Sequence, residues 1–288
     1  MKKLIKKALT EKQISKLRFI KYYFIAISKG IQIKKINSEK YIVSKNNYKF
    51  ETHKKYLSYY ITCFEEFKKY NIQKINDNLI KINFKNFKLI TDIESVMEIP
   101  RAIEKYNLYY KLKPKDVIFD LGAYHGLYSF YAVSLQNNAI VYAFEPDEKN
   151  FKILKQNIIN NNLKNIIPIN KAIYNKNGKI NFTEQGMGSM IDDSGKIEIE
   201  TTTIKSIMNK YKIKKINFIK MDVEGAELEI VDDFFKNKLP NTNFAIASYH
   251  IVNNEKTHIK LEQIFKKNKY KVITANKELH LTTYASKK

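Results

Sequence analysis

The chain has 288 residues, enough for one large domain or two small ones. Hydrophobic residues make up 44% and charged residues 28% of the chain, which excludes a collagen-like chain, wholesale disorder and a polytopic membrane protein. The single cysteine, Cys63, excludes an internal disulfide framework and a cysteine-cluster zinc site, and we expect a cytoplasmic protein.

The net charge of +23 raises the question of a nucleic-acid partner. Only Arg18 and Arg101 are arginines, whereas proteins that grip phosphates or read bases favour the guanidinium fork of arginine. Residues 1–60 contain 16 basic and 3 acidic side chains, so the excess of positive charge lies mainly in the N-terminal segment. A nucleic-acid partner is therefore not favoured, although it stays open.

Residues 1–30 have a basic amphipathic pattern that predicts a helix. The apolar stretch Phe19–Ile27 is interrupted by Lys21 and is shorter than the roughly 20 residues that span a bilayer. We expect this helix to pack on its own domain; peripheral contact of residues 1–30 with the inner membrane surface is an alternative. Three further segments have periodic patterns: a strand and turn at 41–50, a helix at 54–70 and a β-hairpin at 79–91. Residues 1–100 are thus predicted to form a small basic α+β accessory region.

From Asp116 onward, apolar strands alternate with helical patterns. The predicted strands are 117–121, 140–144, 166–170, 216–221, 244–249, 270–274 and 279–284. The predicted helices are 126–135, 147–160, 204–211, 226–235 and 256–267. Short strands and a glycine-rich loop interrupt the series at 178–201. Because parallel strands need helical crossovers, residues 101–288 are predicted to form a doubly wound α/β sheet that binds ligands at the carboxyl ends of its strands.

The sharpest motif is VIFDLGAYHGLYS, residues 117–129, in which a strand ends at Asp120 and a tight turn opens a helix. Its Gly-x-x-x-Gly spacing differs from the dinucleotide fingerprint. A strand-terminal carboxylate repels a diphosphate but holds a ligand with an ammonium group, which favours S-adenosylmethionine over NAD. We expect Asp120, Gly122, Ala123 and Gly126 to bind this cofactor, with the glycines letting the backbone approach the ligand.

The second predicted strand of this domain ends at Glu145, which Pro146 follows. An acidic residue about 20 positions beyond the glycine turn can accept hydrogen bonds from both ribose hydroxyls. The alternative is a favourable interaction with the positive N-terminus of the next helix. We assign Glu145 and Pro146 to the cofactor site.

A third motif, INFIKMDVEGAELEIV, covers residues 216–231. Its strand brings Lys220 and Asp222 to the carboxyl edge of the sheet, and Glu224 and Glu227 lie at the start of a helix. Acidic residues stabilise a helix N-terminus by themselves, so a capping role for Glu227 stays open. Asp222 and Glu224 are predicted to line the cofactor cleft, because a carboxylate there has a desolvation cost that only a function would justify.

Together, DLGAYHG, FEP and KMDVEGAE resemble, in this order, the FkbM family of S-adenosylmethionine-dependent methyltransferases over residues 95–285. The resemblance implies a Rossmann-like, class I seven-stranded sheet and methyl transfer, usually to a hydroxyl of a sugar, glycan or other natural product. It also implies cofactor contacts from Glu98 and, beside the adenine, from Ala172. The family's loop after the third strand is similar to QGMGSM, residues 185–190.

The chain departs from the family pattern at Thr203–Ser206 and at Ser248–His250, which concern the acceptor and the base. His250 is the first candidate for the catalytic base, because its usual pKa is closest to neutrality; hydrogen bonding to a loop carbonyl is the alternative. Asp222 is the second candidate. His125 could line the pocket or face solvent. The remaining histidines lack metal-site spacing, so no metal is required.

Three other functions stay open. An RNA methyltransferase would use the basic, aromatic N-terminal region to contact bases. A non-catalytic module would keep the S-adenosylmethionine fold without the reaction. A dehydrogenase is the least favoured, because the turn lacks the dinucleotide spacing.

Overall fold

The computed structural model describes residues 11–46, 48–54, 57–62, 64, 69–76, 79–98, 103–183, 190–191, 197–252, 255–277 and 280–287. The chain divides into two compact units, an N-terminal unit of Met1–Ile82 with Asp92–Met97, and a sheet unit of Asn83–Thr91 with Glu98–Lys288. Each unit is described by itself below.

The N-terminal unit begins with a helix and an antiparallel sheet. Its elements are α2 (Glu11–Ser28), β1 (Gln32–Lys35), β2 (Lys40–Lys45), β3 (Tyr48–His53), α3 (Leu57–Thr62), β4 (Gln73–Lys74) and α5 (Ile93–Glu98). The strand and turn predicted at 41–50 are confirmed as β2 and β3. The hairpin predicted at 79–91 is confirmed as β5 (Leu79–Phe84) and β6 (Phe87–Asp92), two neighbouring strands that run from one unit into the other.

Helix α2 confirms the predicted N-terminal helix over the residues that the structure describes. Ala26 is fully buried, as expected for a helix packed on its own domain. Four large apolar side chains at helical spacing remain exposed: Ile20, Tyr23, Phe24 and Ile27. Within the described part of the chain, every helix is too short or too polar to span a bilayer.

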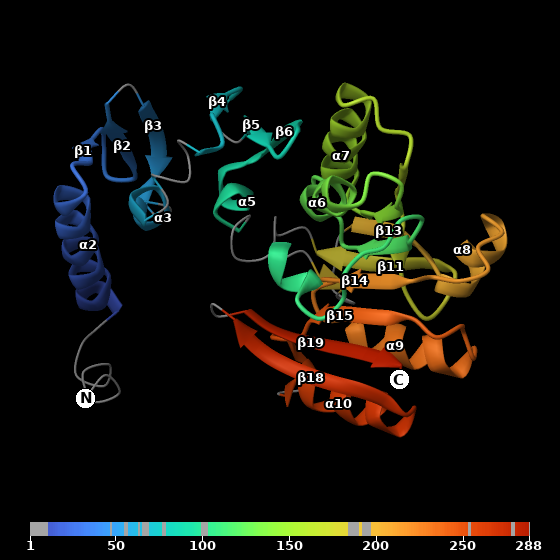
Figure 1. The fold of residues 1–288 in the computed structure, drawn as a ribbon. Helices are drawn as coiled ribbons and strands as arrows, with labels where there is room; N and C mark the ends of the chain where they lie inside the picture. Colours follow the sequence, from blue (N-terminus) through green and yellow to red (C-terminus); the bar gives the residue numbers. More distant parts are fainter. Residues whose placement is uncertain are drawn as a thin grey trace. The chain divides into compact units, whose positions relative to one another are not determined.

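The sheet unit contains the predicted seven-stranded sheet (Figure 1). Its strands are β7 (Val117–Leu121), β8 (Ile140–Phe144), β9 (Ile166–Ile169), β14 (Phe218–Met221), β15 (Asn243–Ala247), β18 (Tyr270–Lys277) and β19 (His280–Lys287). They lie in the order β18-β19-β15-β14-β7-β8-β9, and only β19 runs against the others. Strands β7 and β8 match their predicted ranges to the residue, which confirms the doubly wound architecture.

Five helices connect the strands: α6 (Leu127–Leu135), α7 (Glu148–Asn160), α8 (Ile204–Lys210), α9 (Glu227–Lys236) and α10 (Thr257–Lys267). Helix α6 packs beside β8 and helix α7 beside β9. Figure 1 shows α9 and α10 on the side of the sheet that contains β15, β18 and β19. From β7, the strands β8 and β9 are added toward one edge of the sheet. From β14, the strand β15 is added toward the opposite edge. Right-handed crossovers therefore place α6 and α7 on one face and α9 on the opposite face.

The insertion predicted at 178–201 forms a small second sheet. It consists of β10 (Ala172–Ile173), β11 (Gly178–Thr183), β12 (Met190–Ile191) and β13 (Ile197–Thr202), in the order β10-β13-β11-β12. Most of the loop at 185–190 lies outside the described residues. At the end of the insertion, Thr203 caps α8 by accepting a hydrogen bond from the Ser206 amide at 3.1 Å, so this departure from the family pattern keeps a helix cap.

Between the neighbouring strands β7 and β14, the order in which the chain adds strands to the sheet reverses. Ligands of doubly wound sheets bind at such a switch point. In the pairing of these two strands, Asp120 lies opposite Lys220 and Leu121 lies opposite Met221. Leu121 and Met221 are fully buried in the core. The core thus fixes the two motifs against each other at the carboxyl edge of the sheet.

The glycines of the turn pack closely against other parts of the chain, and their contact with a cofactor stays a prediction. Gly122 has φ +75°, and a Cβ on it would overlap the backbone carbonyl of Asp222. Gly126 has φ +93°, and a Cβ on it would meet Leu154 Cδ1 at 2.7 Å. The space that the glycines leave is filled by the chain itself, so they are needed to pack the turn.

We predict that Gly122→Ala destabilises the sheet unit more than Gly178→Ala does. Both positions have positive φ, which costs an alanine about 1–3 kcal/mol. Only at Gly122 does the added methyl also meet backbone, for a further cost of about 1–3 kcal/mol. Urea unfolding of the two variants checks the difference, and equal midpoints would contradict the packing argument.

Candidate functional site

A buried ion pair joins the two motifs at the switch point. Lys220 Nζ lies 3.0 Å from Asp120 Oδ1, and Ser129 Oγ donates to Asp120 Oδ2 at 2.7 Å. Lys220 also donates to the carbonyl oxygens of Leu121, at 3.3 Å, and Gly122, at 2.6 Å. One ammonium group therefore holds the end of β7 and the first residue of the turn.

Asp120 itself is fully buried, and its two oxygens face Lys220 and Ser129. Direct contact of Asp120 with a cationic ligand stays a prediction. In the structure this carboxylate neutralises a buried lysine and positions the turn. The sequence predicts Lys220 at this edge but not its role, because its partners lie about a hundred residues earlier in the chain.

We predict that Lys220→Met destabilises the sheet unit by about 3–5 kcal/mol, because it leaves the buried Asp120 carboxylate unpaired. The double variant Lys220→Met with Asp120→Asn recovers much of this loss, since no buried charge remains. Lys236→Met is the matched control: its ion pair with Asp232 is exposed to solvent, so its loss should change stability little. Urea unfolding measures all three, and a small effect of Lys220→Met alone would contradict the assignment.

Glu145 follows β8 and is 5% exposed. The backbone amide of Tyr124 donates to its Oε2 at 2.8 Å, and that of Asp147 donates to its Oε1 at 2.9 Å. A carboxylate has about four acceptor sites, so each oxygen can accept one further hydrogen bond. Glu145 thus ties the turn after β7 to the start of α7 and keeps acceptor capacity. Asn170 supports the segment by donating to the Glu145 backbone carbonyl at 2.9 Å.

Burial raises the pKa of Glu145 from 4.5 to about 7, although the two amide donors and Lys220 oppose the shift. Between these pH values the folded protein binds more protons than the unfolded chain. The contribution of Glu145 to the free energy of unfolding therefore falls as pH rises from about 4.5 to about 7.

We predict that Glu145→Gln removes this dependence. Relative to the original chain, the variant gains stability between about pH 5 and about pH 8, by up to about 3 kcal/mol. Urea unfolding at the two pH values, followed by hydrogen exchange of β7 and β8, measures the change. Glu148→Gln, which removes an exposed carboxylate three positions away, serves as the control. A stability difference that is the same at both pH values would contradict the prediction.

Asp222, which follows β14, accepts hydrogen bonds from hydroxyl groups of two other segments. Tyr106 lies in the short helix η3 (Glu104–Asn107), and its hydroxyl donates to Asp222 Oδ2 at 2.8 Å. The hydroxyl of Tyr249 donates to Asp222 Oδ1 at 3.4 Å. Burial alone would raise the pKa of Asp222, but the positive charges of Lys220, Lys105 and His250 outweigh it and lower the pKa. Asp222 is therefore ionised at neutral pH.

His250 lies among three carboxylates. Its Nε2 is 3.1 Å from Glu224 Oε2 and 3.8 Å from Asp222 Oδ1, and its Nδ1 is 2.8 Å from Glu227 Oε1. Burial alone would lower the pKa of His250, but the carboxylates raise it to about 10. With this pKa the ring is charged at neutral pH and cannot accept a proton. The assignment of His250 as the base stays a prediction, and this charge state weighs against it.

Glu227 bonds to the backbone at the start of α9 and also contacts a side chain from another segment. Its Oε1 accepts from the backbone amides of Val223, at 3.4 Å, and Gly225, at 3.3 Å, as expected for an acid at the start of α9. The same oxygen contacts His250. Periodicity could not predict this contact, because it joins segments on neighbouring strands.

The remaining predicted residues are distributed around this edge. Ala123 is buried, and its amide donates to the Phe144 carbonyl at 2.8 Å. Ala172 is half-buried in β10, and Pro146 is half-buried next to Glu145. Glu98 ends α5, but its side chain lies outside the described residues. His125 is buried, with Nδ1 2.9 Å from Thr91 Oγ1, so it does not face solvent.

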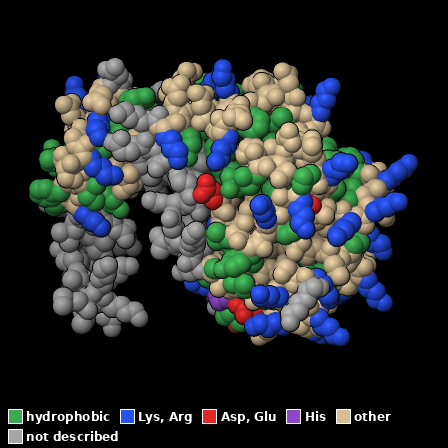
Figure 2. Space-filling view, viewed as in Figure 1, with side chains coloured by type: hydrophobic (Ala, Val, Ile, Leu, Met, Phe, Trp, Pro, Cys, Tyr) green, Lys and Arg blue, Asp and Glu red, His purple; other side chains and the backbone are tan. Residues whose placement is uncertain are grey.

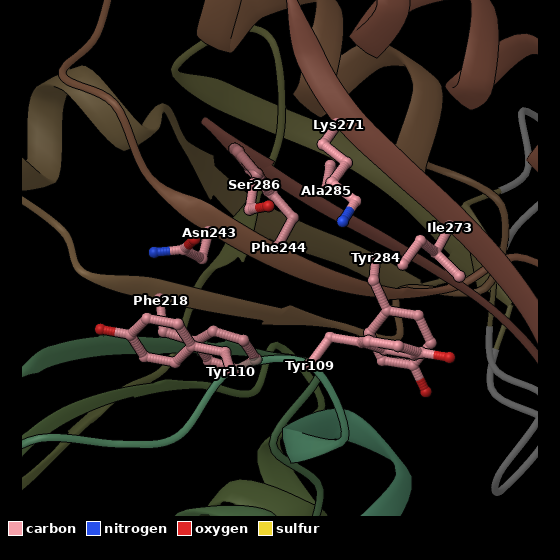
Figure 3. A pocket seen from close by; sticks show the side chains of 10 residues that line it. All are labelled: Tyr109, Tyr110, Phe218, Asn243, Phe244, Lys271, Ile273, Tyr284, Ala285 and Ser286. Atoms are coloured by element: carbon pink, nitrogen blue, oxygen red, sulfur yellow. The ribbon is translucent and has the colours of Figure 1, made fainter. Parts of the chain in front are cut away.

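An aromatic cavity of about 100 Å³ lies at the other edge of the sheet (Figure 3). Phe218 and Asn243, the first residues of β14 and β15, are among its lining residues. Figure 3 shows Tyr110 against Phe218, with ring centroids 5.1 Å apart, and Tyr109 beside Tyr284. The lining contains no acidic residue, so this cavity is distinct from the polar edge described above.

The comparisons with known proteins agree with the geometry. A family model described as the methyltransferase FkbM domain matches residues 120–272, more than half of the chain. The chain belongs to the FkbM methyltransferase family. It is 28% identical over 139 residues to the hexuronic acid methyltransferase AglP of Haloferax volcanii, covering 47% of this chain and 56% of that relative. The chain thus spans about half the length of the curated relative that it matches.

The chain is also similar to solved methyltransferases at low identity. A SAM-dependent methyltransferase from Aquifex aeolicus is 14% identical, with a TM-score of 0.42, over 65% of this chain and 90% of that one. TYW2 of M. jannaschii, solved in complex with AdoMet, is 16% identical, with a TM-score of 0.44, over 74% and 87%. With its strand order and its one antiparallel strand, this FkbM-family chain has the predicted Rossmann-like class I methyltransferase fold.

Proposed function

We propose that this FkbM-family protein uses S-adenosylmethionine to methylate a hydroxyl of a sugar or glycan. The observation that carries the proposal is the placement of Glu145, buried beside the glycine turn with acceptor capacity left on both oxygens. Two adjacent hydroxyls of a ribose match that capacity. The family supports the methyl-transfer class, and the hexuronic acid methyltransferase relative supports a sugar acceptor.

The residues at the switch point fit the cofactor by their chemistry. Glu145 would accept hydrogen bonds from the ribose hydroxyls, and Pro146 and Ala172 would lie near the adenine. The turn at Gly122, held by Lys220, would face the methionine portion. When bound, S-adenosylmethionine would supply a methyl group on a sulfonium: the acceptor oxygen would form a bond to the methyl carbon, and the electron pair of the broken C–S bond would stay on sulfur.

The chain's own contribution is to align the acceptor and to receive its proton. Asp222 is 26% exposed and ionised, and two tyrosine hydroxyls fix its position. We assign it to accept a hydrogen bond from the acceptor hydroxyl and to take the proton as the O–C bond forms. Alignment of oxygen, methyl carbon and sulfur would provide most of the acceleration, because the displacement has to occur in line.

An RNA acceptor is less supported. Figure 2 shows lysine and arginine side chains scattered over the visible face, separated by uncharged surface. Recognition of RNA usually combines a basic groove with aromatic platforms for the bases. A non-catalytic module is also less supported, because Asp222 stays ionised and partly accessible.

The first test is cofactor binding by isothermal titration calorimetry. We predict that the original chain binds S-adenosylmethionine and that, at about pH 8, where Glu145 is ionised, Glu145→Gln weakens binding about 10- to 100-fold, because hydrogen bonds to a charged acceptor are lost. Glu148→Gln, on the exposed side of the next helix, leaves the affinity unchanged. Failure of the original chain to bind would overturn the proposal.

The second arm tests the acceptor. Labelled S-adenosylmethionine is incubated with the protein and with monosaccharides that include hexuronic acids, and the products are analysed by mass spectrometry. Label on a sugar oxygen supports the proposal. Label on RNA alone, in a parallel reaction, would replace the sugar by a nucleic-acid acceptor.

A further inference from the structure

Three potential metal ligands converge at the carboxyl edge of β14 and β15. Asp222 and Glu224 follow β14, and His250 follows β15. One ligand atom from each residue lies within 4.8 Å of the other two. The residues come from segments more than 20 positions apart, so their spacing in the sequence could not reveal the group.

The separations suit a shared cation. Two ligands at about 2.1 Å from one ion and at right angles to each other are about 3.0 Å apart. His250 Nε2 lies 3.1 Å from Glu224 Oε2 and 3.8 Å from Asp222 Oδ1. Small side-chain movements would therefore bring all three atoms around one ion.

The environment of His250 provides a second, independent observation. Its side chain is 9% exposed, yet neither ring nitrogen makes a well-directed hydrogen bond to a described residue. Its Nδ1 lies 2.8 Å from the fully buried Glu227. Metal-binding histidines are usually oriented in this way, with one nitrogen toward the ion and the other toward a carboxylate.

We propose that Asp222, Glu224 and His250 form a site for a divalent cation, with Glu227 positioning the histidine. Two carboxylates and one imidazole suit Mn²⁺ or a similar first-row ion. Three protein ligands leave coordination positions for acceptor oxygens, such as two neighbouring hydroxyls, or a hydroxyl and the carboxylate of a sugar acid. This last role rests on the proposed function; binding of the ion does not.

In this role the cation would hold the acceptor hydroxyl beside Asp222 and withdraw charge from its oxygen, which favours loss of the proton. The arrangement would select acceptors that offer two oxygen ligands over those that offer one. The proposed substrate class thus narrows from sugars in general to sugars that can bind the ion through two oxygens, and a sugar acid fits best.

The test is titration of the full chain with Mn²⁺, followed by the electron paramagnetic resonance signal of the free ion. We expect one ion per chain. His250→Gln and Glu224→Gln should abolish binding, and Glu227→Gln should weaken it about 10- to 100-fold, as expected for a group behind the ligand. Asp232→Asn, a half-exposed carboxylate on α9, removes the same charge and should leave binding unchanged.

Circular dichroism shows whether each variant folds, and Asp222→Asn replaces any variant that does not. Absence of Mn²⁺ binding by the original chain, or equal binding by the ligand variants and Asp232→Asn, would overturn the site. The calorimetric titration with S-adenosylmethionine is run on the same preparations. Binding of the ion without binding of S-adenosylmethionine would support the metal site and refute the proposed function. Binding of S-adenosylmethionine without binding of the ion would refute the metal site and leave the proposed function standing.

Discussion

The ion pair between Lys220 and Asp120 is the interaction on which the functional edge of the molecule depends. The two residues are opposite each other on neighbouring parallel strands, and both are almost fully buried. The same ammonium group binds the carbonyl oxygens of Leu121 and Gly122. A shift in register of either strand would separate the two charges. Because each would then be buried without a partner, the shift would be strongly destabilising. The position of the glycine turn is thereby tied to the position of Asp222, two residues beyond the lysine.

The same lysine affects the charges on both sides of the switch point. It opposes the rise in the pKa of Glu145 and lowers the pKa of Asp222. One buried cation therefore favours the ionised form of both carboxylates, although burial still raises the pKa of Glu145 to about 7. The two halves of the site are coupled electrostatically, even though their carboxylates are on different strands.

Much of the fold could be predicted from the sequence, because strand length and apolar pattern report burial locally. Strands β7 and β8 were predicted to the residue, and Asp120, Glu145 and Asp222 were placed correctly at the carboxyl edge. What could not be predicted depends on contacts between distant segments. The overlap of a Gly122 Cβ with the Asp222 carbonyl and the hydroxyl of Tyr106 on Asp222 both require the assembled sheet.

The family's most specific run, Lys220 to Glu227, gains a physical explanation from these contacts. Strand alternation puts Lys220 and Asp222 on one side of β14 while Met221 points into the core. Positive φ values at Glu224 and Gly225 then turn the chain into α9. The turn leaves Glu224 beside Nε2 of His250 and brings Glu227 to Nδ1. Each charged residue of the run thus meets a partner from another segment of the chain, and insertion of one residue anywhere in it would separate the lysine from Asp120 or the acids from the histidine. The spacing is a consequence of the sheet geometry, and it holds the cofactor turn and the acid cluster at a fixed separation.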